Sequence, residues 1–220
     1  MSALAARLLG LLWLGYVLPG SQLVSELAES RAGHPPLRIE AQLAARDSSA
    51  PRKLVIELHP ELGGRASDDQ GGRWLWKLDR TLSGTQPAPA WLPDLEALVL
   101  RREGDLRSWL ATGGVDLAAN ELARCGQDDC WVLGTRAAPA QVWIGKPGFE
   151  LRRVVRQKDA RTAFDQWQEF AKIRFPAKIE ISDAKGVVAT LTVQSVNPIA
   201  LSAADLQPSW VQAAPAAKAR

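Results

Sequence analysis

The sequence is poor in the residues that most enzymes and metalloproteins use. Its 220 residues include two cysteines, two histidines, one tyrosine and one methionine. The histidines lie far from the cysteines along the chain, so a zinc site with four such ligands in one cluster is excluded. The sequence has no glycine-rich phosphate loop of the Walker type, no G-x-S-x-G motif and no H-E-x-x-H motif. We therefore expect no catalytic residue, no metal and no cofactor, and the protein is not expected to be an enzyme.

A strong charge of one sign is also missing. The chain has 27 Lys and Arg against 24 Asp and Glu, a net charge of +3. This excess is too small to indicate nucleic-acid binding, and no nucleic-acid partner is expected. The most basic stretch has no interleaved aromatic residues, so a solvated strand and turn is the main interpretation and a docking surface for an anionic partner the alternative. That stretch contains Arg152, Arg153, Arg156, Lys158 and Arg161.

A long apolar run occurs only near the first residue. Arg7 precedes an uninterrupted apolar run from Leu8 to Leu18, which Pro19-Gly20-Ser21 ends. As a helix this run covers about 16 Å, roughly half of a bilayer core. That length suits the apolar region of a secretory signal, although no A-x-A-like triplet follows. We expect residues 1–20 to direct export to the periplasm; a buried first helix or an uncleaved anchor is the alternative.

The spacing of the two cysteines agrees with export. Cys125 and Cys130 bracket Gly-Gln-Asp-Asp, which predicts a β-hairpin with a four-residue loop and the two thiols facing each other at its mouth. A disulfide there would close a short loop and contribute roughly 2 kcal/mol in the chain-entropy model. Two reduced thiols are the alternative.

The hydrophobic period changes from helical to alternating along the chain. Residues 21–31 have helical spacing, with Ser21 as a possible N-cap and Gly33 as a stop. Beyond them, apolar and polar residues alternate between turns, which predicts antiparallel strands. The expected strands are 37–43, 53–58, 74–78, the two arms of the cysteine hairpin, 141–145, 149–157, 177–181 and 187–193. A connection rich in proline and alanine, 86–93, leads into a helical stretch over 93–111, and 162–172 fits either a short helix or an irregular strand.

About nine strands and two helical segments make one domain, because no linker or composition shift divides them. We expect the domain to span residues 21–211 and residues 212–220 to be a disordered tail. The predicted fold class is α+β: a strongly curved antiparallel sheet whose concave face is covered by helices.

Such a sheet has more apolar surface on its concave face than two short helices can cover. The remaining side chains either fill the interior or line an apolar cavity, and an apolar cavity suits a lipid. The nine tryptophans can plug such a hollow or line it around an acyl chain, while plain core packing is the ordinary role of any one of them. The candidate lipid-binding residues, taken from strand alternation and the middle helix, are Ile39, Leu43, Leu54, Ile56, Leu58, Trp74, Trp76, Trp109, Trp143, Ile179, Ile181, Leu191 and Val193.

The order of these elements, and several short stretches, resemble a known family. Val142-Trp143-Ile144-Gly145-Lys146 followed by residues 149–155 resembles a strand pair of the LolA-type outer-membrane lipoprotein-sorting proteins. Residues 174–181, 191–197 and 199–208 resemble their closing strands and extended tail. The resemblance covers roughly residues 22–211. The chain departs from the family pattern in its cysteine pair, and the family's lid-closing arginine matches no residue here.

The resemblance implies an unclosed β-half-barrel whose helices form a lid over an apolar cavity. It implies a monomeric periplasmic carrier that shields lipoprotein acyl chains, meets membrane-protein partners in the envelope and carries out no covalent chemistry. The alternative is an envelope sensor or scaffold that has the same fold with a filled interior and binds a protein partner.

Overall fold

The computed structural model describes residues 17–77, 80–157 and 159–213. Most of the expected signal segment, residues 1–16, and most of the expected tail, residues 214–220, lie outside the described residues. No helix in the described ranges is both long and apolar enough to cross a membrane.

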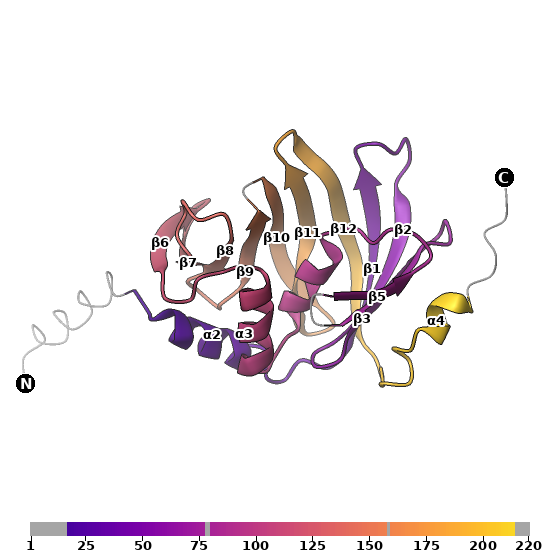
Figure 1. The fold of residues 1–220 in the computed structure, drawn as a ribbon, viewed down its shortest axis with the longest axis horizontal. Coiled ribbons are helices and arrows are strands. Elements are labelled where there is room, and N and C mark those ends of the chain that lie inside the picture. Colours follow the sequence, from indigo (N-terminus) through magenta and orange to yellow (C-terminus); the bar gives the residue numbers. More distant parts are fainter. Residues whose placement is uncertain (1–16, 78–79, 158, 214–220) are drawn as a thin grey trace, which may run out of the picture.

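The described strands form one twelve-stranded antiparallel sheet (Figure 1). The first half contains β1 (Leu37–Ala45), β2 (Arg52–His59), β3 (Gly63–Asp68), β4 (Arg73–Lys77) and β5 (Arg80–Gly84). The second contains β6 (Asn120–Cys125), β7 (Asp128–Leu133), β8 (Gln141–Gly145), β9 (Leu151–Gln157), β10 (Ala160–Phe170), β11 (Ile173–Asp183) and β12 (Gly186–Pro198).

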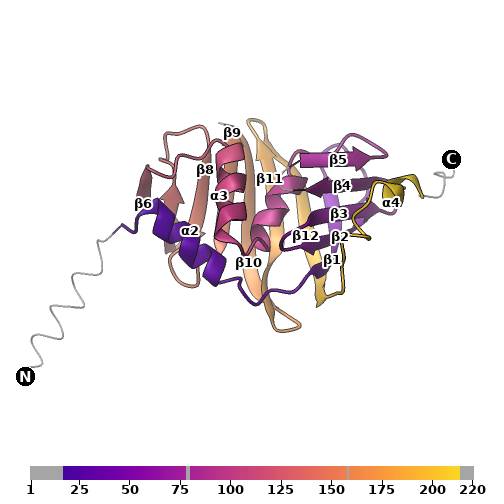
Figure 2. The same cartoon turned by 60° about the horizontal axis from the view of Figure 1, so that its bottom comes forward.

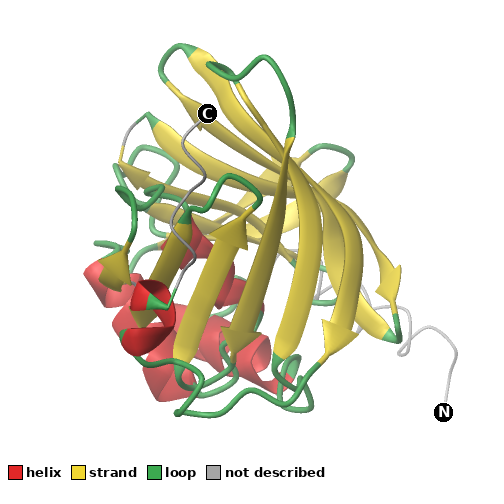
Figure 3. Ribbon diagram, turned by 90° about the vertical axis from the view of Figure 1, so that its right-hand side faces the viewer, coloured by secondary structure: helices red, strands yellow, loops and turns green. Residues whose placement is uncertain are grey.

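Each strand pairs with its neighbours in the sequence, except β5 and β6, and one further pair joins the two halves. There β1 pairs with β12, with Leu37 opposite Pro198 and Ala45 opposite Ala189. The strand order ends at β5 on one side and β6 on the other, so the sheet does not close into a barrel. Figure 3 shows the strongly curved sheet wrapping around the helices. The expected unclosed half-barrel of class α+β is confirmed.

Helices cover the concave face, as expected (Figure 2). They are α2 (Gly20–Glu29), the 3₁₀ helix η2 (Leu92–Leu98) and α3 (Glu103–Thr112). The helical spacing of Leu23, Val24 and Leu27 places these side chains on the buried face of α2. Helix α2 begins at Gly20 with Pro19 as its N-cap, so the expected Ser21 cap is wrong. Every residue of η2 is buried.

A short helix lies at the outer side of the first half of the sheet. It is α4 (Ser209–Gln212), which contacts β4 (Figure 1). The Trp210 ring lies between the guanidinium groups of Arg65 and Arg73, at 5.0 and 4.9 Å from the ring centroid. These cation–π contacts hold residues beyond β12 against the sheet.

The sheet has three strands more than the nine expected: β3 and β5, which lack a clear alternating pattern, and β10. Strand β3 has the sequence Gly-Gly-Arg-Ala-Ser-Asp, with no large apolar residue. A Cβ on Gly64 would lie 2.6 Å from Cζ2 of Trp76, so the indole of β4 occupies the space that a side chain of β3 would fill. The second strand is β5, which pairs with β4.

The segment that fitted either a helix or a strand is β10. Gln166 has a φ of +54°, which interrupts the regular alternation of the strand. Phe164 and Trp167 therefore pack against the same core although they are three residues apart, and Phe170 also contacts this core at the end of the strand.

The cysteine hairpin forms with a shorter turn than expected. Strands β6 and β7 are joined by two residues, and Cys125 pairs with Asp128 across the ladder while Cys130 pairs with Ala123. The expected four-residue loop is therefore wrong. The disulfide between Cys125 and Cys130 is present, with 5.9 Å between the Cα atoms, and it crosses the hairpin diagonally.

Candidate functional site

The larger described cavity lies between the segment before η2 and one end of strands β10–β12. It has a volume of about 440 Å³. Its walls combine apolar side chains with a polar end. The lining residues are Pro89, Ala90, Trp91, Asp94, Arg156, Ala160, Arg161, Thr162, Ile181, Ser182, Asp183 and Val188.

A smaller cavity of about 120 Å³ lies on the other side of the same segment. Pro89 and Trp91 line both cavities, so residues 89–91 form a wall between them. The remaining walls of the smaller cavity come from β1, β2, β4 and the neighbouring connection. They are Leu43, Arg52, Leu54, Trp74, Gln86, Pro87 and Leu92.

The wall is attached to the sheet through Asp94. One carboxylate oxygen of Asp94 accepts a hydrogen bond from Nε of Arg156 on β9 at 2.5 Å, and the other accepts one from Oγ1 of Thr162 on β10 at 2.6 Å. Asp94 is buried, so this charge-assisted pair is stronger than an exposed ion pair would be. It holds the first turn of η2 against the middle of the sheet.

Trp109 of α3 supports the same contact. The Arg156 guanidinium lies 4.8 Å from the centroid of the Trp109 ring, and Trp109 Nε1 donates to the carbonyl oxygen of Pro93 at 3.2 Å. Arg156 thus links β9, η2 and α3. The sequence placed Arg156 in a solvated basic stretch, and the structure places it at the cavity.

The rim of the larger cavity is charged. Arg46, at the end of β1, donates to the Asp183 carboxylate at 3.3 Å and to the carbonyl oxygen of Val187 at 2.9 Å. Burial pushes the pKa of Asp183 upward, but hydrogen bonds from the Lys185 amide and from Arg46 outweigh it and keep this pKa below its ordinary value. The β11–β12 turn is therefore fixed in place beside the cavity.

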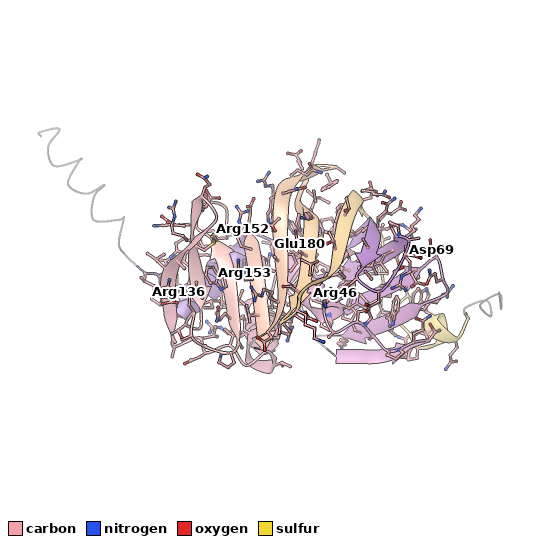
Figure 4. All side chains as sticks on the ribbon, turned by 90° about the horizontal axis from the view of Figure 1, so that it is seen from above. Arg46, Asp69, Arg136, Arg152, Arg153 and Glu180 are labelled. Atoms are coloured by element: carbon pink, nitrogen blue, oxygen red, sulfur yellow. A yellow bond between two sulfur atoms is a disulfide. The ribbon has the colours of Figure 1, made fainter. Side chains whose placement is uncertain are left out.

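The basic stretch is divided rather than gathered in one patch. Arg152 pairs with Glu150 at 2.8 Å, whereas the Arg153 guanidinium lies 4.8 Å from the centroid of the Trp143 ring (Figure 4). Arg161 lines the cavity, and Lys158 lies outside the described residues. The four described arginines of the stretch have different partners and do not form one docking surface.

All thirteen candidate lipid-binding residues are buried. Twelve belong to the main core cluster. Trp143 instead packs with Cys130 and Val132 in a second cluster, on the opposite face of β7 and β8, because inward and outward residues alternate along a strand. Ile181 lines the larger cavity, and Leu43, Leu54 and Trp74 line the smaller one.

Sequence reasoning did not identify the cavity wall itself. Trp91, Asp94 and Thr162 carry no local motif, and Asp94 and Thr162 are 68 residues apart. The available signal was the connection 86–93, whose proline and alanine content indicated a break in the sheet. In the described part of the chain, no group of three or more His, Cys, Asp and Glu side chains is placed to hold a metal ion.

Comparison with solved structures identifies the fold. The protein is similar to an outer membrane lipoprotein-sorting protein domain from Vibrio parahaemolyticus, with a TM-score of 0.60 and 10% identity over 88% of this chain and 98% of that one. It is similar to a DUF1329 family protein from Desulfovibrio piger, with a TM-score of 0.52 and 11% identity over 88% and 98% of the two chains. A LolA superfamily protein from Nitrosomonas europaea gives a TM-score of 0.46 and 13% identity over 88% and 100%.

No protein-family model and no curated protein sequence matches the chain. The likeness to the structures from Vibrio parahaemolyticus and Desulfovibrio piger covers nearly the whole domain. The chain therefore shares the fold of the lipoprotein-sorting domain.

Proposed function

We propose that the protein is a periplasmic carrier that binds lipoprotein acyl chains, or a related lipid, in the cavity between residues 89–94 and strands β10–β12. The cavity of about 440 Å³ carries this proposal, because its volume lies in the range of ligand sites, roughly 300–1,000 Å³. The fold supports it, since the similar domain from Vibrio parahaemolyticus is described as lipoprotein-sorting.

The wall at residues 89–91 gives the site a way to enlarge. If Trp91 moves away from the sheet, the two cavities join, and Leu43, Leu54 and Trp74 become walls of the same hollow. A buried methylene group contributes roughly 0.8 kcal/mol, so a long acyl chain would gain more than about 10 kcal/mol gross. Moving residues 89–91 away from the sheet costs free energy, which offsets part of this gain. The bound lipid can therefore be released.

Titration with a fluorescent fatty acid tests the proposal. Val188 lines the larger cavity, whereas its neighbour Val187 is 47% exposed. Val188→Trp fills the cavity and should weaken binding by about tenfold or more, equivalent to about 1.4 kcal/mol. Val187→Trp is the matched control and should bind as the unmodified protein does.

A second filling variant controls for the case in which Val188→Trp does not fold. Ala90 lies on the opposite wall of the cavity and is exposed, so Ala90→Trp reduces the volume without overpacking the core. Both filling variants should keep the circular dichroism spectrum and lose affinity. Absence of saturable binding by the unmodified protein would refute the carrier function.

The second candidate function is an envelope sensor or scaffold that binds a protein partner. One observation favours it: Trp74, Trp76 and Trp109 are all buried in the main core cluster and fill much of the concave face. Mass spectrometry of lipids that copurify with the protein separates the two candidates. A carrier retains lipid, whereas a scaffold with a filled interior does not.

We also propose that residues 1–20 direct export, that residues 21–211 are the half-barrel domain and that the protein is a monomer. The Cys125–Cys130 disulfide supports an oxidising compartment. Expression of the full chain in a bacterium, followed by fractionation and determination of the N-terminal residue, tests the export segment. Recovery of the protein from the cytoplasm with residue 1 intact and both thiols reduced would refute it.

A further inference from the structure

Arg31, just after α2, is a buried cation with no partner in the described part of the chain. The side chain is 4% exposed. Its Nη1 atom is buried and makes no hydrogen bond, and no carboxylate of the described residues forms an ion pair with the guanidinium. Arg31 follows Leu27 by four residues, which places it on the buried side of the chain.

An isolated buried charge is unfavourable, and this one remains charged. Burial lowers the pKa of Arg31 to about 9, so the guanidinium is protonated at neutral pH. Buried cations in proteins are ordinarily paired with an anion or a hydrogen-bond acceptor. Nη1 of Arg31 has no such partner among the described residues.

A second unsatisfied group lies near Arg31. Nδ1 of His34 is also buried without a hydrogen-bond partner. The His34 amide donates to the carbonyl oxygen of Arg31 at 2.9 Å, so one tight turn carries both side chains, and burial and the charge of Arg31 both lower the pKa of His34. Two nitrogen groups that can donate hydrogen bonds therefore lie near one another without an acceptor.

The surroundings are positive. Arg101 lies within 3.5 Å of the carbonyl oxygen of His34 through Nη1. The nearby carboxylate, Glu61, is already shared by Arg101 and Arg102, and its hydrogen bond from Arg101 lowers the pKa of Glu61 despite opposing burial. Glu61 is therefore already paired with two arginines other than Arg31.

The pair also lies close to the surface. Ala32 and Gly33, between Arg31 and His34, are exposed. A Cβ on Gly33 would meet no atom within 4 Å. The turn that carries both side chains therefore lies at the surface.

We propose that Arg31 and His34 bind one oxyanion of the phosphate type. The guanidinium offers two parallel N–H groups to two oxygens of the anion, and the imidazole donates to a third. This site is distinct from the acyl cavity, because it lies beside the start of β1 whereas the cavity lies at the opposite ends of β11 and β12. Free phosphate and the headgroup of a phospholipid share the required chemistry.

Thermal unfolding of the purified protein in sodium phosphate, against sodium chloride of equal ionic strength, tests the site. At phosphate tenfold above its Kd, the Tm should rise by about 3 to 6 °C. Arg31→Met removes the cation with similar volume and should abolish this rise. Arg124→Met, which removes an exposed arginine paired with Asp129, is the control and should keep it.

The Arg31→Met variant should remain folded, because the substitution removes an unfavourable buried charge. Arg31→Lys, which retains charge but loses the planar fork, should reduce the rise. The proposal is overturned if phosphate does not raise the Tm of the unmodified protein, or if Arg31→Met keeps the full rise.

A second unfolding experiment, with a different ligand, identifies the source of the anion. Short-chain phosphatidylglycerol, below its micelle concentration, is added in place of phosphate. A Tm rise that depends on Arg31 assigns the site to a lipid headgroup, and a rise with inorganic phosphate alone assigns it to the free anion; either result supports the site. A rise with inorganic phosphate that is equal in Arg31→Met overturns the site, whereas a rise with phosphatidylglycerol that is equal in Arg31→Met is assigned to the acyl cavity.

Discussion

The Asp94 carboxylate, at the start of η2, receives hydrogen bonds from two strands, with Arg156 Nε at 2.5 Å as one donor. This contact fastens the helical cover to the concave face, next to the proposed lipid cavity. Its partner Thr162 lies on the adjacent strand. The Asp94 side chain therefore links η2 to two strands at once.

Asp94→Asn should loosen η2 without changing the shape of the side chain. The substitution removes the charge that balances Arg156, and breaking a buried pair in this way costs up to about 3 kcal/mol. Part of this cost is relieved because 21% of the Arg156 side chain is exposed. Hydrogen exchange should show faster exchange of the η2 amides, with a smaller change in β12. Asp129→Asn breaks the exposed pair with Arg124 and should change stability by less than about 1 kcal/mol; equal effects of both variants would contradict the prediction.

Gly64→Ala should destabilise the first half of the sheet. The added Cβ would lie 2.6 Å from the Trp76 ring and 2.9 Å from the carbonyl oxygen of Glu57, so the ring and the strand must shift at a cost of about 1–3 kcal/mol. Gly104→Ala is the matched control, because a Cβ there meets nothing within 4 Å and alanine favours a helix by roughly 0.8–1 kcal/mol. Denaturant unfolding should show the two substitutions acting in opposite directions.

Arg31 should make stability rise with pH in the alkaline range. Burial lowers the pKa of Arg31 from its ordinary value to about 9 in the folded protein, so above pH 9 the unfolded chain binds more protons. The contribution of Arg31 to the free energy of unfolding therefore increases as the pH rises above 9. Below pH 9 the destabilisation caused by its buried charge is fully present. Subtracting the curve of Arg31→Met, measured by urea unfolding, isolates the contribution. A flat difference between pH 9 and 11 would contradict the lowered pKa.

Reduction of the disulfide should weaken the β6–β7 hairpin specifically. The bridge closes a short loop, and its loss should cost about 2 kcal/mol. Cys125→Ser with Cys130→Ser should lower the Tm and speed amide exchange in β6, an edge strand, more than in β1. Alkylation without reductant checks the bridge itself, since an intact disulfide leaves the mass unchanged.

The regular parts of the fold could be predicted because their side chains follow one period. In β1, Leu37, Ile39, Ala41 and Leu43 are buried at every second position, and α2 buries residues three and four apart. Strand β3 could not be predicted, because the apolar volume above Gly64 comes from Trp76 on the next strand. The same alternation identified the inward-facing residues of these strands as candidate lipid-binding residues.

The candidate site was harder to predict than the fold. Strand alternation identifies which residues face inward, and four of the candidate lipid-binding residues line the two cavities. Periodicity cannot show which inward side chains touch each other and which leave space. The wall at Trp91 and the Asp94–Thr162 hydrogen bond both result from the path of an irregular connection across the sheet, and no local pattern encodes that path.

The pairing of β1 with β12 has a consequence for biosynthesis. Strand β1 is among the first parts of the domain to leave the ribosome, whereas its partner β12 is made after every other strand. The two halves of the sheet cannot join until residues 189–198 have emerged, and contacts so distant in sequence form slowly. Under the proposed export of this chain, the delay would keep it unfolded until it has crossed the translocation channel.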